Sequence, residues 1–291
     1  MSSADRGTMR SMLYVPAHKE QWFNGAFGSG ADAVILDLED AVPIDRKAQA
    51  RDNVRQALSA ASNRRIFVRI NDLASPIAFD DLEAVVQPGL SGVQIPKVRS
   101  TRDVEFVARV IDWLEVRRGL EPGTVAILPL IETADAVVVA HEIFSASERV
   151  NYVGAMMAQD GDLMDDLGFE WTDAVAPSML RFQLLLAARA ARVTAVIGGV
   201  SADIRDLGLT REFGKHLRGL GYDGMAVLHP DQVHVANEVF GVTATELERA
   251  RRLVSQFEQA QSAGDAAIEF EGRMVDHAMA RSAYRLLDRG A

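Results

Sequence analysis

Short apolar runs recur along this chain, and most of them end on a polar or charged residue. Eight runs predict β-strands, at Arg10–Pro16, Ala33–Leu38, Ile66–Ile70, Gly92–Pro96, Ala126–Ile131, Val150–Gly154, Thr194–Gly198 and Met225–Leu228. The run at Ala126–Ile131 is continuous rather than alternating, which is typical of a strand buried on both faces of a parallel sheet.

Segments with helical periodicity lie between most of these runs. Two apolar stripes at helical spacing are Ala50, Val54, Ala57 and Leu58, and Val104, Val107, Ile111 and Leu114. Strands that alternate with helices predict right-handed crossovers and a parallel sheet closed into a (β/α)8 TIM barrel. A doubly wound open sheet is the alternative, but no G-x-G-x-x-G sequence follows the first run.

The pattern changes after the eighth run. Residues 1–240 are predicted to form the barrel, and residues 241–291 a C-terminal helical extension. A helix is expected over Val242–Gln261, with Thr243 or Thr245 as its cap. The apolar residues Phe270, Met274 and Val275 follow it, so a neighbouring subunit is expected to cover this segment.

Composition narrows the partners. The 291 residues are 48% hydrophobic and 25% charged, as in a soluble globular protein, and no apolar run reaches the roughly 20 residues of a membrane span. The net charge of −10 argues against nucleic acid and against an anionic membrane. The chain has no cysteine, which excludes disulfides and thiol nucleophiles, and shows no secretory pattern, so a cytoplasmic location is expected.

Polar side chains lie at or just beyond the carboxyl ends of the predicted strands, where a barrel of this kind carries its active site. They are Asp37, Glu39, Asp40, Arg69, Asn71, Lys97, Glu132 and His229, with Asp160, Asp162, Asp165 and Asp166 in an acidic loop after the sixth run. Two carboxylates from neighbouring strands suit Mg²⁺, which keeps part of its water shell. An arginine beside them could hold a carboxylate or an enolate oxygen. No zinc cluster, P-loop or G-x-S-x-G elbow is present.

Each candidate also has a structural interpretation. Glu132 could form an ion pair with Arg69 or Lys97, and Asp162 could be a helix N-cap. At least one of the three acids that follow the second run is expected to pair with Lys47 or Arg51. The hypothesis of a reactive site therefore depends on the whole set of residues meeting at one end of the barrel.

Seven motifs occur in order along the chain: RSMLYVPA (10–17), ADAVILDLEDAV (31–42), FVRIN (67–71), QIPKV (94–98), LPLIET (128–133), GDLMDDLG (161–168) and LGYDGMAVLHPDQV (220–233). Together they resemble the citrate lyase β-subunit-like family of CoA-ester lyases, and the resemblance extends to about Asp276. It implies a (β/α)8 barrel, Mg²⁺, and cleavage or formation of a carbon–carbon bond next to a CoA thioester. Malyl-, citramalyl- or citryl-CoA would give an acyl-CoA and a 2-oxo acid.

The resemblance also assigns roles by motif. It implies that Glu132 of LIET and Asp162 of GDL are the metal ligands, and that Arg69 of VRIN holds the oxo acid or enolate. It further implies that Asp276 of GRMVD is an acid/base that enters the site of a neighbouring subunit, in a homotrimer or homohexamer. The CoA phosphates need cations near the barrel mouth, and the candidates are Arg10, Lys19, Lys47 and Arg51.

The chain departs from the family pattern at the metal aspartate. Many members read G-A-E-D-L, whereas this chain reads GAMMAQDGDL, so an ungapped match places Met157 there. A short insertion restores Asp162, and Asp160 is the alternative ligand. The segment GGVSADIRD lacks an aspartate that many relatives carry near Gly198, which leaves the substrate open.

Two other classes of function stay open. One is a metal-dependent aldolase that acts on a free oxo acid such as pyruvate without CoA. The other is a non-catalytic subunit of a lyase complex, which would not need Mg²⁺ and which a metal titration would therefore distinguish.

Overall fold

The structure, a computed structural model, describes residues 8–60, 64–155, 161–168 and 175–289. It divides into two compact units, Met1–Phe240 and Gly241–Ala291. The strands of the first unit are β1 (Ser11–Pro16), β2 (Ala33–Asp37), β3 (Ile66–Arg69), β4 (Leu90–Ile95), β5 (Ala126–Pro129), β6 (Tyr152–Ala155), β7 (Ala195–Gly198) and β8 (Gly224–Val227). Each of the predicted runs overlaps one of these strands.

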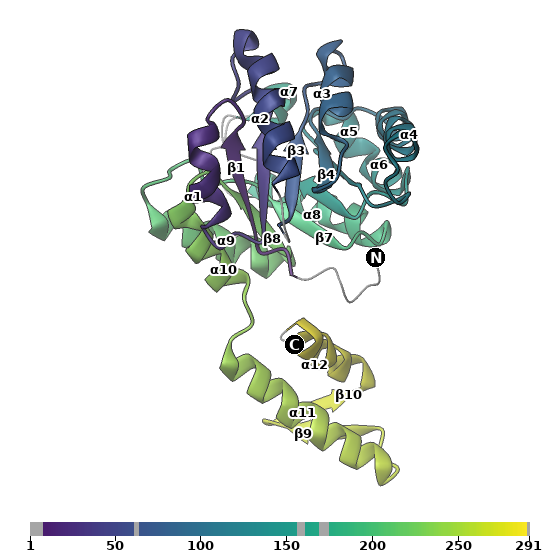
Figure 1. The fold of residues 1–291 in the computed structure, drawn as a ribbon. Coiled ribbons are helices and arrows are strands. Elements are labelled where there is room, and N and C mark those ends of the chain that lie inside the picture. The colour runs from purple at the N-terminus through teal and green to yellow at the C-terminus, as the bar shows by residue number, and fades with distance from the viewer. Residues whose placement is uncertain (1–7, 61–63, 156–160, 169–174, 290–291) are drawn as a thin grey trace. The chain divides into compact units, whose positions relative to one another are not determined.

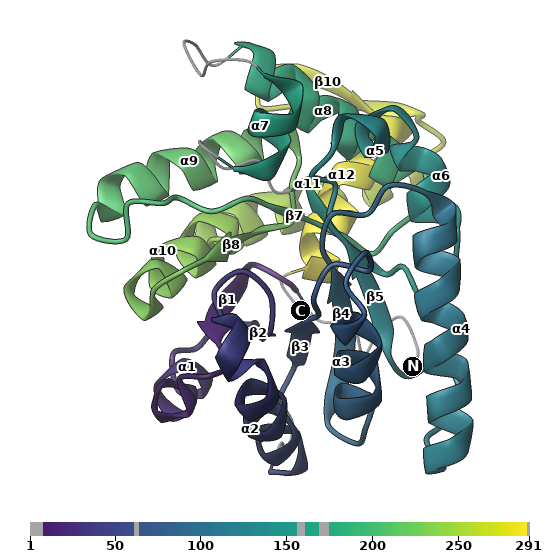
Figure 2. The same ribbon diagram turned by 90° about the horizontal axis from the view of Figure 1, so that it is seen from above.

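All of these strands pair in parallel, in the order β5-β4-β3-β2-β1-β8-β7-β6. Isolated parallel bridges, Ile127 with Val150 and Leu130 with Gly154, bring the two ends of the sheet together. The sheet is thus a nearly closed barrel with helices around it, as the view from above shows (Figure 2). The predicted (β/α)8 TIM barrel is confirmed.

Helices follow the strands and cover the outside of the barrel (Figure 1). They are η2 (Glu20–Trp22), α1 (Phe23–Phe27), η3 (Ile44–Arg46), α2 (Lys47–Ser59), α3 (Ile77–Val85), α4 (Thr101–Arg118), α5 (Ala134–Val138), α6 (Ala140–Ser145), α7 (Asp162–Leu167), α8 (Val175–Ala190), α9 (Leu207–Leu220) and α10 (Pro230–Phe240). The longest of these, α4, begins at a capping box of Ser100 and Asp103 and ends at Gly119, whose φ of 65° suits glycine. It buries the predicted stripe that includes Val104 and Ile111.

Alternation along the strands sorts side chains into two layers. In β1, Met12 belongs to the cluster that fills the barrel, whereas Leu13 and Val15 belong to the larger cluster that packs the strands against the helices. Gly92 is needed in β4 because a Cβ there would lie 2.6 Å from the ring of Phe67, which is part of the inner cluster. The barrel interior is therefore a packed core, and the space for a ligand lies at its end.

The second unit contains α11 (Ala244–Ser262), β9 (Ala267–Phe270), β10 (Arg273–Asp276) and α12 (His277–Arg289). Thr243 caps α11, as expected. The sequence did not predict the antiparallel hairpin of β9 and β10, whose two loop residues, Glu271 and Gly272, both have positive φ.

One expectation about this unit is wrong. Phe270 and Val275 are only 6% and 4% exposed, because they pack with Phe257 of α11 and Ala280 of α12 inside the unit. Of the three apolar residues that a neighbouring subunit was expected to cover, only Met274 is exposed.

None of the helices that the structure describes combines the length and the apolar composition that a membrane span requires.

Candidate active site

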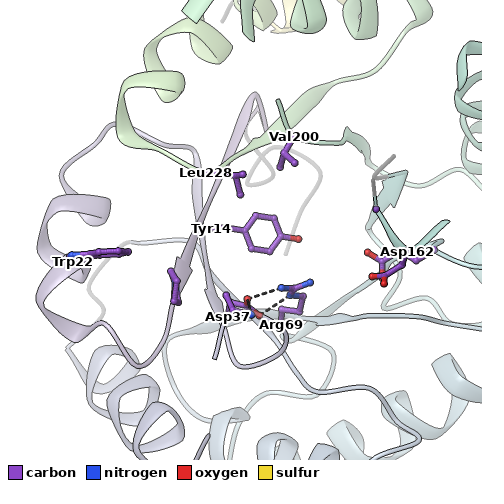
Figure 3. Close-up of a pocket in the computed structure, with 11 residues that line it drawn as sticks. Tyr14, Trp22, Asp37, Arg69, Asp162, Val200 and Leu228 are labelled. Carbon is purple, nitrogen blue, oxygen red and sulfur yellow. Dashed lines mark hydrogen bonds and ion pairs between the residues drawn. The ribbon is translucent and has the colours of Figure 1, made fainter. Parts of the chain in front are cut away.

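A cavity of about 410 Å³ opens at the carboxyl ends of the barrel strands. It is lined by Tyr14, Pro16, Trp22, Asp37, Ala41, Arg69, Glu132, Gly161, Asp162, Val200 and Leu228 (Figure 3). These residues lie far apart in the sequence and meet because parallel strands end at one edge. The cavity brings together Arg69, Glu132 and Asp162, three of the residues singled out in the sequence.

Arg69 ends β3 and is held by two carboxylates. The register of β2 with β3 places Asp37 beside it, and its Nε and Nη2 each donate to an oxygen of Asp37 at 2.7 Å. Its Nη1 lies 2.9 Å from Oε2 of Glu39. Burial alone would lower the pKa of Arg69, but Asp37 and Glu39 raise it, so the guanidinium stays charged. These three contacts leave two of the five guanidinium N–H groups for a ligand.

Glu132 follows β5, and its Oε2 accepts a hydrogen bond from the backbone N–H of Lys97 at 3.0 Å. Lys97 has a φ of 49°, a left-handed conformation that turns the chain at the end of β4. Burial raises the pKa of Glu132 to about 7; the Lys97 N–H and Arg69 oppose this shift, and repulsion from Asp162 adds to it. Glu132 is therefore a desolvated carboxylate that gains from a nearby cation.

The Lys97 ammonium lies among three acidic side chains. Its Nζ is 2.8 Å from Oε1 of Glu39, 3.3 Å from Oδ2 of Asp40 and 3.8 Å from Oδ2 of Asp162. Among the described residues, the Lys97 ammonium thus pairs with these acids, whereas Glu132 is bonded by the backbone N–H of Lys97. Gly161, not Asp162, occupies the N-cap position of α7, so the capping interpretation of Asp162 is wrong.

Tyr14 and Gln94 were not singled out in the sequence. Tyr14 points from β1 into the cavity, and its hydroxyl donates to Oε1 of Gln94 at 2.7 Å (Figure 3). Burial raises the pKa of Tyr14, so the phenol is neutral at physiological pH. The alternation of side chains along β1 could have identified Tyr14, because it turns Tyr14 toward the barrel interior together with Met12.

The donor set fits a hard divalent cation. Glu132 and Asp162 line the same cavity and supply carboxylate oxygens, the ligands that Mg²⁺ prefers. Within the described ranges, no group of three or more histidine, aspartate and glutamate side chains is placed around one metal position. Water and substrate oxygens would complete the shell, as is usual for Mg²⁺. Asp160 and Met157 lie outside the described residues.

The cations expected to bind CoA phosphates are placed differently from one another. Arg10 precedes β1 and pairs with Asp32 at 2.7 Å, at the amino ends of the strands, so the expectation that it lies near the barrel mouth is wrong. Lys19, in the loop after β1, stays near the mouth, with Nζ 5.9 Å from the ring of the cavity-lining Trp22.

Lys47 and Arg51 form hydrogen bonds and an ion pair with other residues of the barrel. The Nζ of Lys47 is buried and donates to the backbone oxygens of Leu38 and Glu39 and to Oδ1 of Asn71, at 2.6 to 2.7 Å. These three bonds use all donors of an ammonium, so the assignment of Lys47 to a CoA phosphate is wrong. Arg51 pairs with Asp81 at 3.1 Å.

Asp276 belongs to the second unit, at the end of β10. Its Oδ1 accepts a hydrogen bond from the backbone N–H of Met279 at 2.9 Å, a contact that stabilises the first turn of α12. A chemical role for Asp276 therefore stays a prediction.

Known proteins are similar to this chain in sequence and in fold. The profile described as "HpcH/HpaI aldolase/citrate lyase" matches residues 10–230. A (3S)-malyl-CoA thioesterase of Cereibacter sphaeroides is 36% identical over 275 residues, which cover 92% of this chain and 90% of that protein. The citrate lyase subunit beta of Escherichia coli K12 is 34% identical over 273 residues, which cover 92% of this chain and 89% of the subunit.

Solved structures are also similar to this chain. Protein CitE from Mycobacterium tuberculosis, in complex with magnesium, acetoacetate and coenzyme A, has a TM-score of 0.77 at 28% identity, and the match covers 99% of both chains. A citrate lyase from Burkholderia xenovorans has a TM-score of 0.83 at 19% identity, which shows a common fold alone.

Proposed function

This chain belongs to the HpcH/HpaI aldolase/citrate lyase family and is a lyase, and on that premise we propose that it is a Mg²⁺-dependent enzyme that cleaves a 3-hydroxyacyl-CoA ester. The products would be an acyl-CoA and a 2-oxo acid. The observation that carries the proposal is the meeting of Glu132, Asp162 and Arg69 in one cavity at the carboxyl ends of the barrel strands.

The reaction sets the demands on the site. The hydroxyl proton of the substrate leaves, its C–O bond becomes a carbonyl, and the bond between C2 and C3 breaks. The electron pair of that bond passes to the thioester as an enolate, and a proton then adds to the enolate carbon. A site for this chemistry must hold the oxo acid, stabilise negative charge and deliver a proton.

Arg69 suits the first two demands. Because Asp37 and Glu39 fix its guanidinium, the two remaining N–H groups would bind a carboxylate without a further loss of side-chain freedom. The neutral hydroxyl of Tyr14 lies on the same cavity wall.

Glu132 and Asp162 would hold the Mg²⁺ ion. A bound ion there would supply Lewis-acid polarisation of the forming carbonyl and would offset the repulsion between the two carboxylates. Glu132, whose pKa burial raises to about 7, would thereby keep its ionised form at neutral pH.

Asp276 is our candidate for the proton donor, supplied by a second copy of the chain in a homo-oligomer. This assignment rests on the resemblance of GRMVD to the family tail. Lys19 is the candidate for a CoA phosphate, because it is the basic residue of the four that keeps its side chain at the mouth without an ion pair among the described residues.

A panel of malyl-, citramalyl- and citryl-CoA, each with Mg²⁺ and with EDTA, tests the proposal. We expect 2-oxo acid to form from at least one ester with Mg²⁺ and its formation to stop with EDTA. A rate that EDTA does not change would contradict the metal role, and no oxo acid from any ester would contradict the lyase reaction on these substrates.

Thioester hydrolysis is the second candidate, because the 36% identical relative is a malyl-CoA thioesterase. It breaks a different bond and releases free CoA with a hydroxy acid. The same panel distinguishes the two reactions, since a thiol reagent reports free CoA and the lyase reaction alone produces none.

A further inference from the structure

A fully buried amide lies one hydrogen bond behind the cavity wall. Gln94 is in β4, opposite Arg69 in the register with β3, and is 0% exposed. Its Oε1 accepts the hydroxyl of Tyr14 at 2.7 Å, whereas its Nε2 has no hydrogen-bond partner among the described residues. A buried N–H group without a partner is costly and rare in folded proteins, so this amide calls for an explanation.

Rotation of the amide group explains how Nε2 can gain a hydrogen-bond partner. The two ends of a carboxamide have nearly the same shape, so a half-turn about the last side-chain bond exchanges Oε1 and Nε2 in place. In that orientation Nε2 donates to the Tyr14 oxygen, and the phenol hydrogen is no longer directed at Gln94. The oxygen left over is the less costly group, because buried carbonyls lack partners more often than buried N–H groups do.

The position of Tyr14 indicates what its hydrogen would meet. Its ring lines the cavity, with the guanidinium carbon of Arg69 5.4 Å from the ring centroid. Its hydroxyl is turned toward the side of the cavity on which Asp162 lies (Figure 3). An anion bound by Arg69 would therefore lie beside the phenol. A neutral phenol is a suitable donor to such an anion, because it brings no second charge into a buried site.

We propose that Gln94 orients Tyr14 as a hydrogen-bond donor to the 2-oxo acid that Arg69 holds. The phenol donates to Gln94 when the cavity is empty, and the amide turns to donate to the phenol when the oxo acid is bound. Tyr14 is then a substrate-binding residue, and Gln94 is a positioning residue that acts through it. This inference rests on the proposed function, since it needs an anionic oxo acid in the cavity.

Calorimetric binding tests the inference without turnover. The probe is the tightest-binding of pyruvate, glyoxylate and oxaloacetate, measured against the full-length protein with saturating Mg²⁺. Tyr14→Phe should weaken its affinity about tenfold, because a hydrogen bond to a charged group is lost. Gln94→Leu should weaken the oxo-acid affinity about threefold to tenfold when Tyr14 is present. It should have no further effect when combined with Tyr14→Phe.

Tyr222→Phe is the matched control. Tyr222 is 2% exposed, and its hydroxyl donates to the backbone oxygen of Arg181 at 2.9 Å, so the variant removes a buried, hydrogen-bonded hydroxyl that does not line the cavity. Its oxo-acid affinity should equal that of the wild type. Mg²⁺ affinity and the melting temperature report whether each variant is folded. Gln94→Met, which keeps the length of the side chain, replaces Gln94→Leu if that variant does not fold.

The outcomes separate this inference from the proposed function. Unchanged oxo-acid affinity in Tyr14→Phe would overturn the inference alone. So would a loss on replacing Gln94 that is equally large in the Tyr14→Phe background, because Gln94 would then act by a route other than Tyr14. A wild-type protein that binds none of the three oxo acids with Mg²⁺ would overturn the proposed function and this inference with it.

Discussion

Charged residues of the cavity hold one another in place before a substrate binds. Arg69 is fixed by Asp37 and Glu39, and Lys97 joins Glu39 to the side of the cavity that carries Asp162. Preorganised charges of this kind need little rearrangement when charge develops on a bound substrate.

Arg69→Lys should lower kcat about 100-fold, because an ammonium cannot bind Asp37 in a bidentate way and still present a paired donor to an oxo acid. Steady-state kinetics with the best ester of the panel measures the effect. Mg²⁺ affinity should stay close to that of the wild type. Normal turnover in this variant would identify Arg69 as a structural ion-pair partner.

Glu132→Ala and Asp162→Ala should each weaken Mg²⁺ binding by roughly 100-fold, because each removes a charged ligand oxygen. Calorimetric titration with MgCl₂ measures this loss. Asp165→Ala is the matched control, since Asp165 is an exposed aspartate of the same helix that does not line the cavity. Wild-type affinity in Asp162→Ala would point to Asp160 instead.

At the scale of single residues, the sequence identifies functional residues at or after the ends of strands better than those in the interior of strands. Arg69 lies at the end of a predicted strand, Glu132 and Asp162 follow predicted strands, and the structure brings all three to one cavity. Gln94 lies within a strand, and its place in the site became evident only once the register of β3 with β4 paired it with Arg69. Arg10 precedes its strand, and that position alone places it at the other end of the barrel.

At the scale of elements, apolar runs were sufficient to predict all eight barrel strands, because strands buried on both faces need continuous apolar sequence. The hairpin of β9 and β10 was missed for the opposite reason. Its residues Ala267, Ile268 and Glu269 are half-exposed or exposed, and its turn is Glu271-Gly272 rather than the more typical Asn-Gly or Asp-Gly.

Glu115 joins α4 to the segment before β5 by hydrogen bonds and to the segment before β6 by an ion pair. Glu115 of α4 is 0% exposed and accepts hydrogen bonds from Arg149 and from the backbone N–H groups of Gly123 and Val125. Burial alone would raise the pKa of Glu115, but these bonds outweigh it and hold the pKa below its ordinary value of 4.5.

Glu115→Gln should lower the free energy of unfolding by about 3 kcal/mol at pH 7, because it removes the buried counter-charge of Arg149 and leaves only the half-exposed Asp112. A carboxylate with a lowered folded-state pKa stabilises the fold above its unfolded pKa, and this contribution is lost as the pH falls through the folded value. The difference from wild type should therefore shrink below about pH 4.

Urea unfolding at pH 7 and pH 3.5 measures this dependence. Asp112→Asn is the matched control, because Asp112 pairs with the same Arg149 at 2.6 Å but its side chain is 50% exposed. Its cost should stay below about 1 kcal/mol. Equal costs for the two substitutions would show that burial does not set the strength of this pair.

At the scale of the whole molecule, two compact units follow one another along the chain. The residues of the proposed metal site belong to the first unit, and Asp276 belongs to the second. The second unit buries Phe270 and Val275 in its own core, so its composition gives no separate argument for a neighbouring subunit. A homotrimer or homohexamer stays a prediction from the family resemblance.

Mixing two inactive variants tests that prediction. Asp276→Ala and Glu132→Ala, combined under conditions that allow subunit exchange, should regain part of the wild-type activity. Mixed oligomers would contain sites in which the metal ligands and Asp276 are intact and come from different chains. No recovery despite exchange confirmed by mass spectrometry would show that Asp276 does not act between subunits.

We propose that Mg²⁺-dependent cleavage of a carbon–carbon bond takes place in the cavity of Glu132, Asp162 and Arg69. Mass spectrometry of the CoA products, after incubation of each ester with the wild-type protein, tests it most directly. With Mg²⁺ we predict an acyl-CoA shortened by the carbons of the oxo acid, formed in equal amount with that acid, and no product with EDTA or with Glu132→Ala. Free CoA with an intact hydroxy acid, or an acyl-CoA that forms equally well in EDTA, would contradict the account.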